Sequence, residues 1–509
     1  MVGARLAQGG RSVCVLERGR RWEPHEFPRT FGASAGAVWD EGRTHGLLDY
    51  RVFGRIDVLQ GSGVGGGSLC YFNVALRAPA AVLERPGWPA ALRGGALAPY
   101  YERVEAVIAP APLRPPPGYP VPARTTAFLH AARQAGYDAE LLPLALHTGA
   151  SRAHPASGVV QGPCTFTSDC LLGCRPRSKH SLDVTYLPLG ERAGLEVRPL
   201  HVVDHLARAG DRWRVRARVL DPDDPASPSD RVELTADQVV VAAGSVGSTE
   251  LLLRCRDVHA TLPRLPSPLG HRFSANGDML FAGTKDAGVV VDPTTGPSIT
   301  AGAFVQRPGS PHLVQLQDLG YPAALTGLFD GALPVRRRLA ALGATVTGYA
   351  RAAAGGRPFA AGPVFAGTPV PRFLPYLGMG TDAGNGRYRL DGAGQLRLDW
   401  DPAASAGMYA EMEEAMGRLS DALGGAYVRS LPWRRPLRRL LTAHPLGGCV
   451  MGDDPVTSVV DHRGEVWGHP GLFVCDGAVV PGPLAVNPSL TIAALAERTA
   501  QWMLHGREA

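Results

Sequence analysis

Apolar and polar positions at the start of the chain predict a short helix, a turn and a strand. Residues 3–8 form the expected helix, Gly9 and Gly10 the turn, and residues 13–16 an apolar strand that ends at Glu17. An acidic residue after such a strand is typical of the second half of a βαβ nucleotide-binding unit. We therefore expect the first strand of that unit and its G-x-G-x-x-G turn to precede Met1.

Further apolar runs predict more of the same α/β architecture. A helix over Ser181–Ala193 leads through Gly194 into a strand over Glu196–Val203. Residues 205–235 alternate like a hairpin. Val239–Val241 is a buried strand that a small-residue turn connects to a helix. Residues 20–58 show no regular pattern, so we expect irregular structure there.

Other segments lack nucleotide-binding signals and predict a second domain. Amphipathic helices are expected around residues 100–108 and 126–135, strands at 388–390 and 396–401, and a long helix over 406–423. The pattern therefore predicts two domains that interleave along the sequence. The nucleotide-binding domain takes residues 1–84, 176–284 and 436–509, and the substrate domain takes 85–175 and 285–435.

Composition narrows the class of protein. A chain of 509 residues with 45% hydrophobic and 19% charged residues is typical of a soluble globular enzyme. The net charge of +6 is small and no basic block alternates with aromatics, so nucleic-acid binding is not expected. No apolar run is long enough for a transmembrane segment, and no secretory signal is visible. Eight scattered cysteines favour a reducing, cytoplasmic location.

The last sixty residues carry the candidate chemistry. His444 opens a Gly-rich turn, and a short apolar strand then ends at Asp476-Gly477. Asn487-Pro488 begins an alanine-rich helix. A His can accept a proton near neutral pH, an Asn can hydrogen-bond an oxygen, and a helix N-terminus stabilises negative charge. These groups suit alcohol oxidation at a flavin.

Five segments in this order resemble the glucose–methanol–choline (GMC) family of flavin oxidoreductases, in its cholesterol oxidase-like branch. The segments are residues 15–19, 63–73, 239–248, 444–449 and 476–498. The resemblance implies a Rossmann-like FAD-binding domain, interleaved with an α+β substrate domain built on an antiparallel sheet. It also implies FAD as cofactor, a hydrophobic alcohol as substrate, and oxygen or another electron acceptor. Transient contact with a membrane surface is compatible with such a substrate.

The resemblance assigns roles to individual residues. His444 would remove the hydroxyl proton of the substrate, and Asn487 would present its amide to the substrate oxygen. Glu17 would bind the adenosine ribose, and Val203 would contact adenine. The residues implied in FAD binding are Glu17, Gly61, Gly63, Gly65, Gly66, Gly67, Ser68, Asn73, Val203, Ala243, Gly244, Asp476, Gly477, Asn487, Pro488 and Ser489.

The sequence departs from the family in two places. Sterol oxidases carry a Glu that shuttles a proton during double-bond isomerisation, whereas residues 368–377 contain no carboxylate. Isomerase activity and a sterol substrate are therefore not assured. Cys164, Cys170 and Cys174 resemble a four-cysteine segment of some bacterial relatives, but Thr167 replaces one position. An incomplete ligand set favours a structural loop, so no metal is expected.

Alternatives remain open at this point. Long-chain alcohols are candidate substrates beside sterols, and the sequence fits an oxidase as well as a dehydrogenase. The first strand of the nucleotide-binding unit and its glycine turn are not found after Met1. This raises the alternative of a truncated or degenerate homologue without flavin or activity. A serine hydrolase is disfavoured because no G-x-S-x-G turn connects a strand to a helix. Residues 336–338, three arginines, predict a solvated helix face or loop, or a lid at the substrate entrance.

Overall fold

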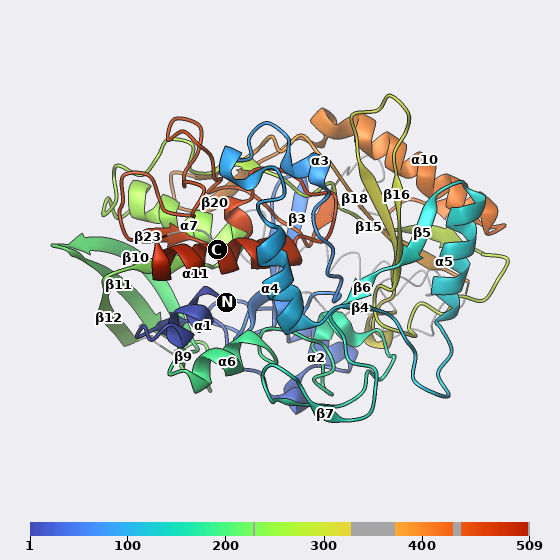
Figure 1. Cartoon of the computed structure of the whole chain (residues 1–509), viewed down its shortest axis with the longest axis horizontal. Coiled ribbons are helices and arrows are strands. Elements are labelled where there is room, and N and C mark those ends of the chain that lie inside the picture. The colour runs from blue at the N-terminus through green and yellow to red at the C-terminus, as the bar shows by residue number, and fades with distance from the viewer. Residues whose placement is uncertain (228–229, 327–371, 431–438, 507–509) are drawn as a thin grey trace.

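The computed structural model describes residues 1–227, 230–326, 372–430 and 439–506. Helices and short strands from the start, middle and end of the chain lie together in one part of the molecule (Figure 1). An antiparallel sheet with the helices α5 and α10 forms the other part (Figure 1). The arginines at 336–338 and the stretch 368–371 fall outside the described residues.

The parallel strands of the nucleotide-binding part occur as two pairs. Strand β1 (Cys14–Leu16) pairs with β9 (Glu196–Arg198), and β13 (Val239–Val241) pairs with β23 (Leu472–Val474). Helix α1 (Val2–Gln8) precedes β1 and contacts α11 (Ser489–His505) and α6 (Tyr186–Arg192), while α7 (Gly244–Asp257) follows β13. The Rossmann-like arrangement expected from the strand–turn–helix patterns is therefore present.

Several expected elements differ in detail. The single strand predicted over Glu196–Val203 is wrong, because Leu200 has φ 60° and the chain turns there from β9 into β10 (His201–Ala209). The predicted hairpin is a three-stranded antiparallel sheet of β10, β11 (Arg212–Val219) and β12 (Asp230–Ala236). The helix predicted from Ser181 begins at Tyr186.

Residues 20–58 are more regular than the sequence indicated. Strands β2 (Leu48–Val52) and β3 (Ile56–Gly61) form an antiparallel hairpin, and β22 (Leu440–Thr442) joins β3 in parallel. The hairpin escaped prediction because Asp49 and Asp57 interrupt its apolar pattern, although both are buried. This small sheet matters for the site because it ends on one side at the glycine-rich loop and on the other at His444.

The substrate part is built on a six-stranded antiparallel sheet. Its order is β21 (Ala426–Val428), β15 (Met279–Lys285), β18 (Leu374–Gly380), β17 (Val314–Asp318), β16 (Ala301–Val305) and β5 (Asp138–Leu141). Strand β15 lies in a stretch that the sequence assigned to nucleotide binding, so the second substrate segment begins earlier than expected. Helices α5 (Ala123–Gln134) and α10 (Ala406–Ala422) pack on the sheet.

Alternation along β17 gives the two faces of this sheet different characters. Val314 and Leu316 belong to the main core, together with Met412 of α10. Gln315 and Gln317 therefore point to the opposite face. Both glutamines are almost completely buried, so that face is covered by protein as well. The covering segment includes the C-terminal motif around residue 487, described below.

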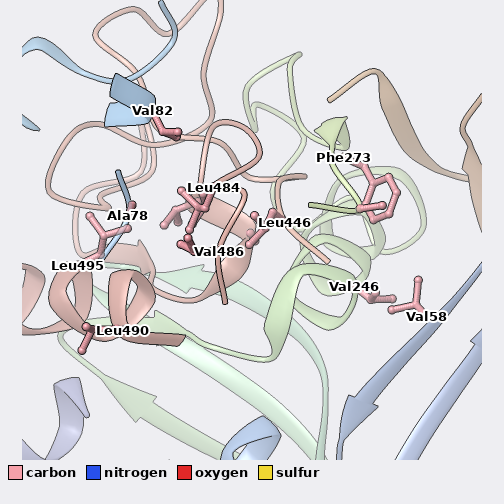
Figure 2. Close-up of a cluster of buried hydrophobic side chains, with 14 of the residues drawn as sticks. Val58, Ala78, Val82, Val246, Phe273, Leu446, Leu484, Val486, Leu490 and Leu495 are labelled. Atoms are coloured by element: carbon pink, nitrogen blue, oxygen red, sulfur yellow. The ribbon is translucent and has the colours of Figure 1, made fainter. Parts of the chain in front are cut away.

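The main core joins segments that are distant in the sequence. Figure 2 shows Val58 of β3 beside Val246 of α7, and Leu446, Leu484 and Val486 between α7 and α11. Branched and aliphatic side chains here are removed from water, which stabilises the fold by about 25 cal/mol per Å² of apolar surface. The loops that carry both candidate catalytic residues are thus anchored in the core.

Shorter elements complete the fold. A second three-stranded antiparallel sheet comprises β14 (His271–Phe273), β19 (Gly386–Leu390) and β20 (Leu396–Asp399). The remaining elements are α2 (Phe31–Ala35), α3 (Ala80–Leu83), α4 (Ala98–Ile108), β4 (Ala111–Pro112), β6 (Pro143–Leu144), β7 (Arg152–Ala153) and β8 (Val160–Gln161). Among the described helices, none has both the length and the apolar character of a membrane span.

Candidate functional site

His444 lies just after β22 and forms a hydrogen-bonded pair with Asp278. The Nδ1 atom of His444 is 2.9 Å from Oδ1 and 3.1 Å from Oδ2 of Asp278. The His side chain is 15% exposed, whereas the Asp side chain is fully buried. An ionised carboxylate only accepts hydrogen bonds, so the contact is satisfied in the tautomer that has the ring proton on Nδ1 of His444. The remaining nitrogen, Nε2, is then the acceptor of this imidazole.

Asp278 is a site residue that the sequence analysis missed. Its Oδ2 also accepts hydrogen bonds from Thr442 Oγ1 at 2.8 Å and from the backbone amide of Ala443 at 2.9 Å. The carboxylate is therefore held from the side of β22 as well as by the imidazole. The local sequence around Asp278 resembles an ordinary Asn-Gly turn before a strand, and its partner is 166 positions away.

The turn that carries Asp278 also reaches the segment before Asn487. Asn276 donates from Nδ2 to the carbonyl of Val486 at 2.9 Å, and its Oδ1 accepts from the amides of Leu484 and Ala485. A Cβ atom at Gly277, which has φ 64°, would lie 2.5 Å from the backbone of Gly380. The turn therefore fits only with glycine at this position. Three consecutive residues thus tie the segment before Asn487 to His444.

Asn487 is buried, and its side chain is oriented by the substrate sheet. Its Oδ1 accepts a hydrogen bond from Gln317 Nε2 at 2.7 Å. Asn487 does not cap the helix that follows it, because the cap position of α11 is Pro488 and no side chain caps that helix. Ser489 donates from Oγ to the carbonyl of Val74 at 3.3 Å. With its oxygen engaged, the Asn487 amide keeps its N–H groups for another acceptor.

The glycine-rich loop between β3 and residue 69 contains two kinds of glycine. A Cβ atom at Gly61 would lie 2.5 Å from the Gly66 carbonyl, and one at Gly65 would lie 2.8 Å from Leu69. A Cβ atom at Gly66 or Gly67 would meet no atom within 4 Å. The first pair is therefore needed for the fold of the loop, whereas the second pair borders open space.

Two polar side chains fasten this loop to its surroundings. Glu17, directly after β1, accepts hydrogen bonds from the amides of Gly19 at 2.7 Å and Gly63 at 3.3 Å. Burial raises the pKa of the Glu17 carboxyl, and these two amides oppose the shift. Ser68 donates from Oγ to the Gly65 carbonyl at 2.7 Å and accepts from the Leu182 amide at 2.9 Å. The end of β1 and the loop thus form one unit.

Asp476 connects the end of β23 to the start of α7. Its Oδ2 accepts from the amide of Gly244 at 2.8 Å and from the Ser248 hydroxyl, and its Oδ1 accepts from the amide of Ala478 at 2.7 Å. Burial raises the pKa of this carboxyl, and the same donors oppose the shift. Gly477 accepts from the Gly447 amide at 2.9 Å, which joins this motif to the His444 turn. The neighbouring Ala243 is exposed.

The remaining predicted residues occupy different surroundings. Val203 lies in β10 and packs against the main core. Asn73 has φ 66° and is fully buried; its Nδ2 lies 3.5 Å from Cys170 Sγ, and its Oδ1 has no hydrogen-bond partner in the described residues. All eight cysteines are free. In the described part of the chain, no three His, Cys, Asp or Glu side chains are arranged to hold a metal ion.

The geometry disfavours the hydrolase alternative. A Ser–His–Asp hydrolase requires a hydroxyl on the imidazole nitrogen opposite the carboxylate. No described residue hydrogen-bonds to Nε2 of His444. The described residues therefore do not supply the nucleophile of such a triad at His444.

Comparisons with known proteins agree with this arrangement. The GMC oxidoreductase family models match residues 6–256 and 403–496. A cholesterol oxidase from Mycobacterium tuberculosis is 28% identical over 551 residues, covering 97% of this chain and 87% of that one. A long-chain-alcohol oxidase from Arabidopsis thaliana is 23% identical, covering 97% of this chain and 64% of that one.

A solved structure shares the fold over the whole chain. It is the pyridoxine 4-oxidase from Mesorbium loti, with a TM-score of 0.63, 18% identity, and coverage of 100% of this chain and 97% of that chain. Two matching family models in the expected order, together with relatives that align over nearly the whole chain, agree on one family. The chain belongs to the GMC oxidoreductase family and is an FAD-dependent oxidoreductase that acts on CH–OH donors.

Proposed function

We propose that the protein oxidises the CH–OH group of a hydrophobic alcohol, either a sterol or a long-chain alcohol. His444 accepts the hydroxyl proton, and Asn487 hydrogen-bonds to the substrate oxygen. The observation that carries the proposal is the pair of oriented side chains: His444 has an acceptor nitrogen, and Asn487 has its oxygen bound to Gln317. His444 thus offers an acceptor and Asn487 a donor, which match the two hydrogen-bonding capacities of an alcohol.

The described residues fit FAD by three features. Gly66 and Gly67 border open space, so a flat or anionic group could approach the loop backbone. Ala242 and Ala243 are exposed at the end of β13, where a nucleotide would meet small side chains. The buried Oδ1 atom of Asn73 has no hydrogen-bond partner among the described residues, so a donor group of the cofactor could satisfy it.

The proposed roles follow from these positions. Bound FAD would accept the hydride from the carbinol carbon. The loop 61–68 and Glu17 would hold the pyrophosphate and ribose, and the segment 487–489 would face the carbonyl edge of the flavin. His444 takes the hydroxyl proton on Nε2 as the C–H bond breaks. The N-terminus of α11 favours the negative charge that develops nearby. Oxygen or another acceptor would then reoxidise the bound FAD.

The apolar side chains near Gln317 support a hydrophobic alcohol as the substrate. Leu377 and Met379 of β18 lie on the sheet face that also carries Gln317, and they belong to an apolar cluster with Phe166 and Leu280. The curated relatives are named as cholesterol and long-chain-alcohol oxidases. Double-bond isomerisation is not part of the proposal, because residues 368–377 contain no carboxylate.

An anaerobic reduction experiment tests the proposal. The FAD-loaded protein is mixed with a sterol or with a long-chain primary alcohol, and the visible flavin absorbance is followed. We expect the flavin bands to bleach with at least one of them. In His444→Gln the bands should persist while the rate of bleaching falls roughly 10²- to 10⁴-fold, the usual contribution of a general base.

A matched control separates the base from other histidines. His259 is exposed, follows the end of α7 and stacks on His205 rather than on His444, so the flavin of His259→Gln should bleach at the wild-type rate. Full retention of activity in His444→Gln would contradict the assigned base. A flavin-loaded protein that no hydrophobic alcohol reduces would contradict the substrate class, and a chain that binds no FAD would indicate the degenerate homologue.

A further inference from the structure

We infer that Asp278 is a positioning residue that fixes the tautomer of His444, and that without it the imidazole cannot act as a base. This inference rests on the proposed function, because it specifies how His444 is made competent. Asp278 touches neither substrate nor reacting atoms. It acts through the imidazole, from the opposite side of the ring.

The first step is the direction of the hydrogen bond. The two oxygens of Asp278 lie 2.9 and 3.1 Å from His444 Nδ1. A neutral imidazole carries one proton, and a carboxylate partner draws that proton to the facing nitrogen. Nε2 therefore has a free lone pair. In the other tautomer the Nε2 lone pair would be lost, and the buried carboxylate would face a second acceptor.

The second step is the fixed orientation of the carboxylate. Thr442 Oγ1 and the Ala443 amide both donate to Oδ2, at 2.8 and 2.9 Å. The Asp278 side chain is fully buried, so water cannot replace either donor without a change of structure. Rotation of the carboxylate would break two hydrogen bonds. The carboxylate orientation that accepts a hydrogen bond from His444 Nδ1 is thus the one in which both Asp278 oxygens have hydrogen-bond partners.

The third step is the location of Asp278 in the chain. It follows the turn Asn276-Gly277, whose residues have φ 54° and 64°. Asn276 holds the Val486 carbonyl at 2.9 Å, one residue before Asn487. The same turn therefore sets the imidazole tautomer and positions the backbone beside the second catalytic residue. A purely structural carboxylate would not need to meet the imidazole at all.

The proton balance of the reaction agrees with this role. The O–H bond of the alcohol breaks and its proton passes to Nε2, while the C–H bond breaks and the hydride passes to FAD, which is reduced by two electrons as the alcohol becomes a carbonyl. The imidazole is then a cation beside an anionic carboxylate. Asp278 gains no proton at any stage; it stabilises the positive charge and keeps the ring in place.

The substitution Asp278→Asn tests the inference sharply. Thr442 and Ala443 both donate to one side of the group, so the amide oxygen of the new side chain must face them. Its NH₂ group then faces His444 and donates to Nδ1, which places the ring proton on Nε2. A comparable change in the Ser–His–Asp triad lowers kcat about 10⁴-fold through the wrong tautomer. We expect a loss of roughly 10³-fold or more in the rate of flavin reduction, with little change in KM.

The direct readout is the ¹⁵N chemical shift of the His444 ring in the FAD-loaded full chain without substrate, assigned by comparison with His444→Gln. In the wild type the proton should reside on Nδ1, and in Asp278→Asn on Nε2. A proton on Nε2 of the wild type overturns the inference even if the variant fails to fold. Wild-type kinetics in a folded Asp278→Asn also overturns it.

Asp382→Asn is the matched control, because Asp382 follows β18 as a buried carboxylate and hydrogen-bonds to the same turn. It accepts from Ser274 Oγ and the amides of Ala275 and Gly277 without contacting His444. The Asp382→Asn substitution should change the stability of the protein and leave the ring proton of His444 on Nδ1. A shift of the ring proton in this control would contradict a role specific to Asp278. The tautomer is measured without alcohol, so the two claims can fail separately. A ring proton on Nδ1 of His444, combined with a flavin that no alcohol reduces, would reject the proposed function and leave the role of Asp278 in setting the tautomer intact.

Discussion

Gln317 donates a hydrogen bond from Nε2 to Oδ1 of Asn487 at 2.7 Å, although the two residues are 170 positions apart. The same amide nitrogen donates to Gln315 Oε1 at 2.9 Å. Gln317 therefore has both amide protons engaged and cannot rotate without loss. Its partner Asn487 is oriented with its oxygen toward the substrate sheet and its nitrogen toward the other side.

This relationship predicts the effect of Gln317→Met. The variant keeps the side-chain length but leaves the Asn487 amide without its donor, so the amide can flip. We expect a roughly 10- to 100-fold slower flavin reduction at saturating alcohol, the usual cost of a misplaced catalytic group. Stopped-flow absorbance measures the rate of flavin reduction. Gln315→Met, which leaves the bond to Asn487 intact, should lose less; equal losses in both variants would contradict the orienting role.

A second prediction concerns the open side of the glycine-rich loop. A Cβ atom at Gly67 meets no protein atom within 4 Å, and its backbone is outside the positive-φ region. Gly67→Val should therefore leave the melting temperature of the apoprotein unchanged and strongly reduce the FAD content, which absorbance measures. Gly392→Val is the control, since that glycine also borders open space but belongs to the connection between β19 and β20. Normal FAD content in Gly67→Val would remove this loop from the cofactor site.

A third prediction concerns pH and the buried Asp49. Burial alone would raise the pKa of this carboxyl, but Arg18 at 2.5 Å and Arg51 at 3.0 Å lower it from 3.8 to about 2. Because the pKa is depressed in the folded state, the contribution to stability is present above 3.8 and is lost as the pH falls through about 2. This contribution is roughly 2 kcal/mol at neutral pH.

Denaturant unfolding of Asp49→Asn checks this value. The difference in unfolding free energy from the wild type should be largest at neutral pH and should shrink as the pH falls below about 4. Asp257→Asn, which removes an exposed partner of Arg256, serves as the control and should show little effect at any pH. A difference for Asp49→Asn that stays constant with pH would contradict the lowered pKa.

A fourth prediction concerns the ion pair inside the substrate part. Arg124 and Asp318 are both fully buried and 2.7 Å apart, and Asp318 also accepts from the amides of Thr300 and Ala301. Arg124→Met removes one charge and leaves the other uncompensated, so we expect about 3–5 kcal/mol of destabilisation. Thermal or urea unfolding measures it. The double variant Arg124→Met, Asp318→Asn should be less destabilised than the sum of the single changes, and strict additivity would contradict a direct coupling.

The candidate site residues that the sequence singled out are those with a local signal. His444, Asn487 and the loop 61–68 are recognisable because turns, strand ends and helix starts leave glycine, proline and small residues in fixed order. The predicted limits of α4, α5 and α10 were close to the observed ones because apolar residues recur at helical spacing. These features are local, so a single sequence displays them.

The residues that orient the site could not be predicted in the same way. Asp278 resembles a turn residue, and only the folded chain brings it to an imidazole 166 positions away. Gln317 offered a signal, because Val314–Asp318 alternates apolar and polar residues, which indicates a strand with one polar face. What that face meets depends on how the two parts pack. Long-range partners of this kind are not determined by periodicity or propensity.

The dyad of His444 and Asp278 is shared between the two parts of the molecule, since one residue follows β22 and the other precedes β15. On the proposed mechanism, neither part alone contains a working base. A chain in which the two parts are not packed together would leave the imidazole without the carboxylate that directs its proton. Turnover would therefore report that both parts of the fold are correctly assembled.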